Sequence, residues 1–357
     1  MQDIFEEYLR EEEPQKKEKG YAWHTAIGLQ AVDGLETSDY LIDTAKKNIE
    51  GDITFEEANQ LIQSYYKENV NRIEKNRTEE ADKVSVRIAQ ILSENSFVFS
   101  PAQYISIHKR LFDGVYKHAG EIRDYNITKA EWVLDGDTVM YGGALDLRAT
   151  LNYDFSVEKE FSYKGLSINE TIKHLAVFIS RLWQIHVFGE GNTRTTAVFF
   201  IKYLRTLGFD VTNDIFAENA WYFRNSLVRA NYTNLKKDVH ETTEFLELFL
   251  RNLLLGENNE LKNRCLHIKS VLKCKKNDEN CTLDCTLDEI VVLKLIAENS
   301  KITQKQIAEK INKSERTVKT ITVSLEENGF IAREGGKRFG YWKILKDIYG
   351  ACYDTFR

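Results

Sequence analysis

The sequence is poor in the residues that interrupt helices. It contains 2 prolines and 19 glycines among 357 residues, about 6% of the chain, where an average protein carries roughly 12%. Because these two residues supply much of the chemistry of tight turns, we expect few turns and long helices. Hydrophobic residues make up 42% and charged residues 29% of the chain, a globular composition that excludes a fibrous or low-complexity protein.

Two further absences bear on the environment of the protein. No stretch approaches the roughly 20 apolar residues of a membrane span. The acidic N-terminal segment lacks the basic region and apolar run of an export signal. Five cysteines, an odd number without disulfide-like spacing, suit a reducing compartment. We therefore expect a cytoplasmic protein with no membrane contact.

The cysteines gather near the start of the C-terminal part of the chain. Cys274, Cys281 and Cys285 follow Cys265 and His267. Their spacings differ from the paired short spacings of zinc fingers. We expect free thiols in a linker rather than a structural metal.

The net charge of -6 conceals an asymmetry between the two parts of the chain. Residues 262–357 contain 19 Lys and Arg against 13 Asp and Glu, a surplus of +6, which leaves -12 for residues 1–261. A basic terminal module on an acidic body is typical of proteins that bind polyanions, although a solvated surface can carry the same small surplus.

Apolar periodicity predicts a mainly α fold in several parts. We expect an N-terminal helical module (1–75), a helical core (76–256), a linker (257–285) and a C-terminal module (286–347). In the core, two apolar helices flank a short polar loop: one begins at the Ser167 capping box and reaches about His186, and the next extends from Thr195 to Leu207. Between residues 128 and 143, the β-rich runs 132–134 and 138–141 are separated by Asp-Gly-Asp, which predicts a β-hairpin.

The C-terminal module has the pattern of a winged helix-turn-helix. Three helices are predicted at 287–297, 303–311 and 314–328, followed by a hairpin with a turn at Gly335-Gly336. On the third helix, Arg316, Thr317 and Lys319 are candidates for reading DNA bases, and Lys337 and Arg338 at the hairpin tip are candidates for phosphate contacts. Winged helices also serve as protein contacts, and that alternative stays open.

The polar loop at residues 186–194 has the residue types of a phosphate site. Gly189 and Gly191 let the backbone turn and approach a ligand closely, and the N–H groups that begin the next helix favour an anion. Asn192 can donate a hydrogen bond from its side chain, and Arg194 offers a planar fork suited to phosphate.

Two other residues of this loop add chemistry. Glu190 supplies the hard oxygen that Mg²⁺ uses when it bridges phosphates, and His186 can accept a hydroxyl proton near neutral pH. Each feature alone has an ordinary structural explanation, since a histidine at a helix end is often a cap and a glycine loop is often only a turn. Their combination within nine residues favours a functional site.

The run His186-Val187-Phe188-Gly189-Glu190-Gly191-Asn192-Thr193-Arg194 resembles the signature loop of the Fic domain family, H-x-F-x-(D/E)-G-N-(G/K)-R-x-x-R. Members of that family typically move AMP from ATP onto a Ser, Thr or Tyr hydroxyl of a target protein. The resemblance covers about residues 97–255, including His108 to Phe112, Tyr116, Gly120 and Arg123. It places the predicted hairpin at the position of the family's flap, which pairs with a target backbone by strand addition.

The resemblance implies a role for each residue of the loop. His186 would deprotonate the attacking hydroxyl, Phe188 would anchor the loop and Glu190 would hold Mg²⁺. The nucleotide phosphates would be bound by Gly191, Asn192, Thr193 and Arg194, with Arg194 on the β-phosphate.

Two residues depart from the family pattern. The second motif arginine is Ala197 here, and Thr193 replaces the usual Gly or Lys. Loss of one charge-assisted contact costs about 1.5–3 kcal/mol of binding, which weakens nucleotide binding but removes neither the base nor the metal ligand.

The N-terminal residues 26–35 and 49–54 resemble the VbhA-type antitoxin module that accompanies some Fic domains. There a helix of form (S/T)-x-x-x-E-(G/N) directs its Glu onto the second motif arginine and blocks ATP placement. The aligned residues here are Leu29 and Asp33, neither of which is the family residue. Because Asp33 would face Ala197, we expect the inhibitory ion pair to be lost and the N-terminal module to serve mainly as structure.

The sequence supports two hypotheses. The first is a protein adenylyltransferase that uses ATP and Mg²⁺ and acts on an unidentified protein. The second is a DNA-binding transcriptional regulator with a nucleotide-sensing or inert core. The oligomeric state, including a homo-oligomer, stays open.

Overall fold

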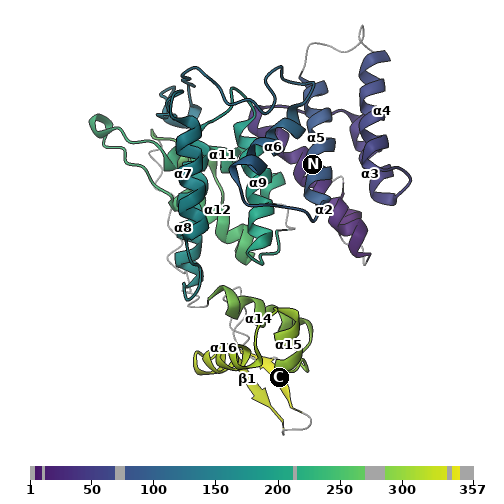
Figure 1. The fold of residues 1–357 in the computed structure, drawn as a ribbon, viewed down its shortest axis with the longest axis vertical. Coiled ribbons are helices and arrows are strands. Elements are labelled where there is room, and N and C mark those ends of the chain that lie inside the picture. The colour runs from purple at the N-terminus through teal and green to yellow at the C-terminus, as the bar shows by residue number, and fades with distance from the viewer. Residues whose placement is uncertain are drawn as a thin grey trace. The chain divides into compact units, whose positions relative to one another are not determined.

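The computed structural model describes residues 5–9, 13–68, 77–211, 215–269, 286–335 and 340–345. The chain is mainly helical, as the sequence predicts (Figure 1). It divides into two compact units. One contains residues 1–160, 176–254 and 259–274, and the other contains residues 161–175, 255–258 and 275–357.

The N-terminal helices belong to the same compact unit as the loop at 186–194. Ser38 caps the third helix by accepting a hydrogen bond from the Leu41 N–H, and Gly51 ends it in a left-handed conformation. The elements of this part are α1 (Glu6–Leu9), α2 (Pro14–Gly28), the 3-10 turn η1 (Leu29–Asp33), α3 (Asp39–Glu50), α4 (Phe55–Glu68) and α5 (Thr78–Ser93).

Helix α2 packs along α5 and approaches α10 (Ile215–Glu218) very closely. Trp23 is fully buried and donates a hydrogen bond from its indole to Asn48 Oδ1 at 3.0 Å. A Cβ atom at Gly28 would lie 2.4 Å from the Ala217 Cα, so only glycine permits this approach. The N-terminal helices are therefore part of the core rather than an appendage.

Helices α8 (Ile168–Ile185) and α9 (Asn192–Thr206) flank the loop at 186–194, and α8 belongs to this unit from Ala176 onward. Helix α9 is buried from Asn192 through Leu204, and α5 and α6 both pack against it (Figure 1). The elements are α6 (Pro101–Phe112), η2 (Trp132–Leu134), α7 (Leu147–Glu160), α8 (Ile168–Ile185), α9 (Asn192–Thr206), α11 (Ala220–Ala230), η3 (Leu235–Lys237), α12 (Glu244–Leu255) and α13 (Asn263–Leu266).

The predicted hairpin at 132–141 is wrong in its secondary structure. Trp132–Leu134 form a 3-10 turn, and no described residue of the segment lies in a strand. The Glu131 N–H donates to the Asp137 carbonyl at 2.9 Å, and Gly136 donates back to the Glu131 carbonyl at 3.0 Å. Because Val133 and Leu134 are both fully buried, the alternating exposure that a hairpin requires is absent. The segment is a compact loop.

Residues 286–345 form the predicted winged helix, apart from the part of the hairpin that lies outside the described residues. Strands β1 and β2 are antiparallel, with Ile331 opposite Ile344 and Glu334 opposite Tyr341. Trp342 is buried and donates from its indole to the Ile302 carbonyl at 3.0 Å. The elements are α14 (Leu287–Glu298), α15 (Gln304–Lys310), α16 (Glu315–Glu327), β1 (Ile331–Glu334) and β2 (Tyr341–Ile344).

Two expectations about the surroundings can be compared with the structure. Within the described part of the chain, none of the helices combines the length and apolar character of a membrane span. Cys265 is disulfide-bonded, so the expectation of free thiols is wrong for this residue. Cys274, Cys281 and Cys285 lie outside the described residues.

Candidate active site

The loop between α8 and α9 begins with a reversal of the backbone at His186. This residue has φ 51°, in the left-handed region that costs a non-glycine side chain about 1–2 kcal/mol. The side chain of Asn192 holds the loop closed: its Oδ1 accepts from the Phe188 N–H at 3.1 Å, and its Nδ2 donates to the Phe188 carbonyl at 2.8 Å. Asn192 thus has its side chain engaged within the loop.

Phe188 lies in the core. It is fully buried, and its ring stacks on His108 with 3.7 Å between centroids and an interplanar angle of 12°. Tyr104 stacks near the same ring at 5.6 Å. Phe188 thereby fixes the middle of the loop against α6.

His108 is a second fixing point that the sequence did not single out for a role. Its Nδ1 accepts a hydrogen bond from the Gly120 N–H at 2.8 Å, so the proton is on Nε2, which donates to the Glu190 carbonyl at 3.0 Å. Burial lowers the pKa of His108 to about 4. This histidine is therefore neutral near pH 7 and positions the backbone of Glu190.

The start of α9 has the geometry of an anion site. Gly191 precedes the helix with φ 72°, and a Cβ there would lie 2.4 Å from the Phe112 ring. No side chain caps the helix at this position. The first-turn N–H groups therefore remain for a ligand, and the positive end of the helix dipole favours an anion. Thr193 is anchored by its hydroxyl, which accepts from the Trp183 indole at 3.0 Å.

The imidazole of His186 is almost covered, with 4% of the residue exposed. Its Nδ1 lies 3.2 Å from the Trp183 carbonyl, which can only accept, so Nδ1 carries the proton and Nε2 presents a lone pair. Nε2 has no hydrogen-bond partner among the described residues. Burial is the main reason why the pKa of His186 lies well below 6.5, and the positive charge of Lys129 lowers it further. His186 is thus a neutral base near pH 7.

Glu190 projects outward from the loop, with 62% of its side chain exposed. Its Oε2 lies 3.4 Å from the Lys129 ammonium. One carboxylate combined with substrate phosphates is a common way to hold Mg²⁺, and an exposed carboxylate with one loosely placed lysine is compatible with it. Among the residues that the structure describes, no group of three or more His, Cys, Asp or Glu side chains could hold a metal ion. A Mg²⁺ ion at Glu190 would therefore need further ligands from the substrate phosphates.

Arg194 is fully buried, and its guanidinium is hydrogen-bonded and ion-paired to other side chains of the protein. Nη2 donates to Glu80 Oε1 at 2.6 Å and to the Tyr116 hydroxyl at 3.0 Å, and Nη1 donates to Gln30 Oε1 at 2.9 Å. Nε lies 2.8 Å from Asp33 Oδ2 as an ion pair, with the N–H poorly aligned for a hydrogen bond. Burial acts to lower the pKa of Arg194, but Asp33, Tyr116 and Glu80 outweigh it and raise that pKa.

The expectation that Asp33 has lost its ion-pair partner is therefore wrong. Asp33 ends the turn η1 and pairs with the first motif arginine, Arg194, in place of the missing second one. Leu29, at the start of the same turn, is fully buried and packs η1 into the core. Ala197 lies one helical turn after Arg194 and is also fully buried.

Three partners of Arg194 had no assigned role in the sequence interpretation. Gln30, Glu80 and Tyr116 come from three separate segments that the fold brings to one side chain. No local pattern distinguishes Glu80 from any other acidic residue in the first turn of a helix. A buried arginine must have acceptors for its N–H groups, and this requirement alone could have suggested that Arg194 has such partners.

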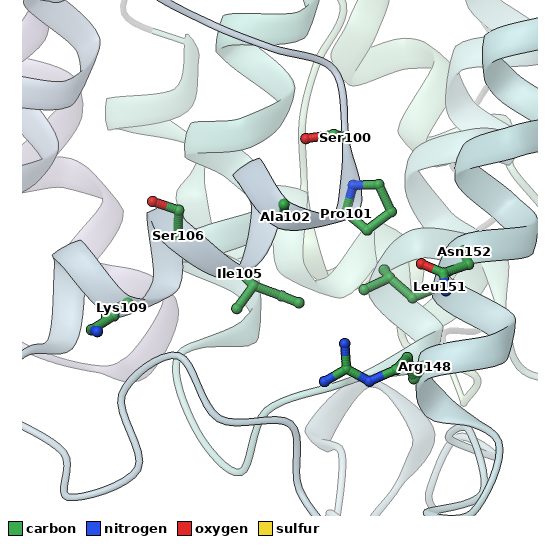
Figure 2. A pocket seen from close by; sticks show the side chains of 9 residues that line it. All are labelled: Ser100, Pro101, Ala102, Ile105, Ser106, Lys109, Arg148, Leu151 and Asn152. Carbon is green, nitrogen blue, oxygen red and sulfur yellow. The ribbon is translucent and has the colours of Figure 1, made fainter.

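A pocket of about 560 Å³ lies elsewhere in this unit, between α6 and α7 (Figure 2). Pro101 and Ile105 line it from α6, and Arg148 and Leu151 line it from α7. It contains none of the residues of the 186–194 loop.

The candidate DNA contacts of the C-terminal unit are only partly described. Arg316 and Lys319 are exposed on α16, as a role in DNA recognition requires. Lys337 and Arg338 lie outside the described residues.

The fold and the loop together define a helical domain in which His186 precedes a helix N-terminus that no side chain caps. Residues 98–204 match the model of the Fic/DOC family, and residues 289–332 match the model of the winged helix-turn-helix DNA-binding family. The chain thus carries a Fic/DOC domain and a C-terminal winged helix-turn-helix.

The chain is also similar to solved structures. A Fic family protein from Desulfovibrio desulfuricans G20 is 12% identical, with a TM-score of 0.44 over 96% of this chain and 92% of that chain. No curated protein matches the sequence.

Proposed function

We propose that this protein is a nucleotidyltransferase that moves AMP from ATP onto a Ser, Thr or Tyr hydroxyl of a protein. The observation that carries the proposal is the orientation of His186. Its Nδ1 is engaged by the Trp183 carbonyl, which leaves Nε2 as the base, beside a helix start that no side chain caps. A base next to an anion site is what transfer from a nucleotide to a hydroxyl needs.

In the proposed reaction, the target hydroxyl oxygen attacks the α-phosphorus of ATP. The hydroxyl proton passes to Nε2 of His186, the new O–P bond forms, and the bond from the α-phosphorus to the β-phosphate oxygen breaks to release pyrophosphate. The N–H groups at the start of α9 bind the phosphates. Glu190 holds Mg²⁺, which when bound neutralises phosphate charge.

Arg194 joins this reaction only after a change of partners. All its described contacts are to protein groups, so a phosphate must displace Asp33 and Gln30 to reach the guanidinium. We propose that Arg194 binds the β-phosphate once η1 withdraws.

The test is transfer of label from α-³²P-ATP with Mg²⁺ to the protein itself or to proteins of a cell extract. We expect labelling by the wild type, and a loss of about 10²- to 10⁴-fold in His186→Ala. His118→Ala is the matched control, because the side chain of His118 is 82% exposed. Labelling that survives in His186→Ala would overturn the proposed mechanism.

A second function, DNA-binding regulation with a core that does not transfer nucleotide, has its own support. The C-terminal unit matches a DNA-binding family, and Arg316 and Lys319 are exposed on its third helix. The occupied state of Arg194 is also the state expected of a core that does not bind ATP.

DNA binding can be measured as affinity for duplex fragments at several salt concentrations. If Lys337 and Arg338 contact phosphates, replacing each by Ala should reduce the salt slope by about one unit. Salt-sensitive DNA binding without labelling by any nucleoside triphosphate would select the regulator. Labelling without DNA binding would select the transferase alone.

A further inference from the structure

Arg123 is a buried arginine that contacts only backbone carbonyls in its described hydrogen bonds. The residue is 5% exposed. Nε donates to the His186 carbonyl at 2.7 Å, Nη2 donates to the Gly142 carbonyl at 2.6 Å, and Nη1 donates to the Tyr125 carbonyl. Nη2 also lies 3.4 Å from the Ile185 carbonyl.

Two of these carbonyls, those of Ile185 and His186, lie where α8 ends. The last C=O groups of a helix have no donor within the helix, and buried ones need one from elsewhere. The chain reverses at His186, which removes the next helical turn. Arg123 supplies the missing donors to Ile185 and His186, and its own N–H donates to the Val187 carbonyl at 2.9 Å.

The same side chain ties the 128–143 segment to the base. Gly142 accepts from Arg123 and donates from its N–H to the Gln184 carbonyl at 3.3 Å. Its neighbour Tyr141 places its ring 4.3 Å from the imidazole of His186. Arg123 therefore holds the backbone carbonyl of His186, which fixes the position of the imidazole. Through Gly142 it also fixes the Tyr141 ring, which lies against that imidazole.

We propose that Arg123 is the positioning residue of this site, which holds the strained backbone of His186 and the 128–143 segment in register so that Nε2 faces the substrate. The proposal rests on the proposed function and assigns no contact between Arg123 and the nucleotide. An arginine suits the task because its planar fork presents five N–H donors to several acceptors at once. A lysine ammonium in the same place would reach fewer carbonyls.

The first measurement separates kcat from KM in Arg123→Lys. A shift of about 1 Å in a reacting group can lower the rate about 100-fold. We expect kcat to fall by about this factor and KM for ATP to change by less than about threefold, because the phosphate site at the start of α9 is untouched. Arg205→Lys is the matched control, since Arg205 donates to the Leu92 carbonyl at 2.6 Å and takes no part in the loop.

The second measurement does not depend on activity. Diethyl pyrocarbonate modifies accessible imidazole nitrogens, and mass spectrometry reports the rate at each histidine. We expect His186 to react at least about tenfold faster in Arg123→Lys than in the wild type or in Arg205→Lys, because release of the backbone uncovers the ring. This result would support the proposal even if the wild type transferred no nucleotide.

If Arg123→Lys is unfolded by circular dichroism, Arg123→Ala is assayed with millimolar guanidinium chloride. If added guanidinium restores the slow wild-type modification of His186, and this effect saturates as its concentration rises, the result supports the positioning role of Arg123. Two results overturn the proposal: an unchanged modification rate in folded Arg123→Lys, or a loss of kcat in Arg205→Lys equal to that in Arg123→Lys.

Discussion

Asp33 Oδ2 lies 2.8 Å from Nε of Arg194, so a residue of the N-terminal turn η1 is ion-paired with the arginine of the candidate nucleotide site. The side chain of Arg194 is fully buried, and that of Asp33 is 26% exposed. Because Asp33 covers the Nε edge of the guanidinium, a phosphate can bind at that edge only after Asp33 has moved away. The hypothesis that the N-terminal module leaves ATP placement unhindered assumed that Asp33 has no arginine partner, and the ion pair with Arg194 contradicts that assumption.

Asp33→Ala should strengthen ATP binding. It removes one competing carboxylate while Glu80 still neutralises the guanidinium, so the buried charge of Arg194 keeps an ion-pair partner. A charge-assisted contact is worth about 1.5–3 kcal/mol, and we expect KM for ATP to fall by about tenfold or more. Asp52→Ala, an exposed aspartate of the same module, is the control. An unchanged or higher KM in Asp33→Ala would show that this pair does not oppose nucleotide.

Ala197→Arg should fail to restore the missing second arginine. Ala197 is fully buried within the buried stretch of α9, so a long cation there must displace packed side chains and lose its hydration. We expect a loss of more than about 3 kcal/mol in the free energy of unfolding, measured by urea denaturation. Ala149→Arg, on an exposed position of α7, should change it by less than about 0.5 kcal/mol. Tighter ATP binding by a stable Ala197→Arg would contradict this expectation.

Gly191→Ala should be more damaging than another substitution at a positive φ. A Cβ at Gly136, which has φ 83°, would meet nothing within 4 Å, whereas a Cβ at Gly191 would lie 2.4 Å from the Phe112 ring. Gly136→Ala should therefore cost only about 1–2 kcal/mol for its backbone conformation. Gly191→Ala should cost clearly more and lose nucleotide transfer as well. Equal melting temperatures of the two variants would refute the importance of this close approach.

The stability of the protein should fall as the pH falls below neutral. Burial lowers the pKa of His108 to about 4, whereas an unfolded histidine titrates near 6.5. Between these values the unfolded state binds more protons, so the free energy of unfolding decreases as the pH drops from about 6.5 to about 4. The depressed pKa of His186 acts in the same direction.

His108→Gln tests this origin of the acid sensitivity. The slope of unfolding free energy against pH should be reduced by up to about 1.4 kcal/mol per pH unit, the value for one proton. His118→Gln, at an exposed position, should keep the wild-type slope. A wild-type slope in a folded His108→Gln variant would assign the acid sensitivity to other groups.

Sequence patterns predicted the helices near the site better than the segment at 132–141. The apolar spacing before His186 and after Thr195 correctly predicted α8 and α9, because a buried helix needs apolar residues at helical intervals. The β-rich runs at 132–141 misled because Val133 and Leu134 are held by burial in a 3-10 turn. Tertiary packing overrides β propensity in so short a segment. Helix α7 was not predicted.

The sequence by itself determined the chemical groups of the site: the histidine, the glycines that permit the turn and the helix start behind them lie within nine consecutive residues, so local order alone brings them together. Only the tertiary structure decided what surrounds them. Arg194 is closed by Gln30, Asp33, Glu80 and Tyr116, and His186 is held by Arg123. A buried guanidinium or carbonyl must find partners wherever the folded chain supplies them, and those partners lie far away in the sequence.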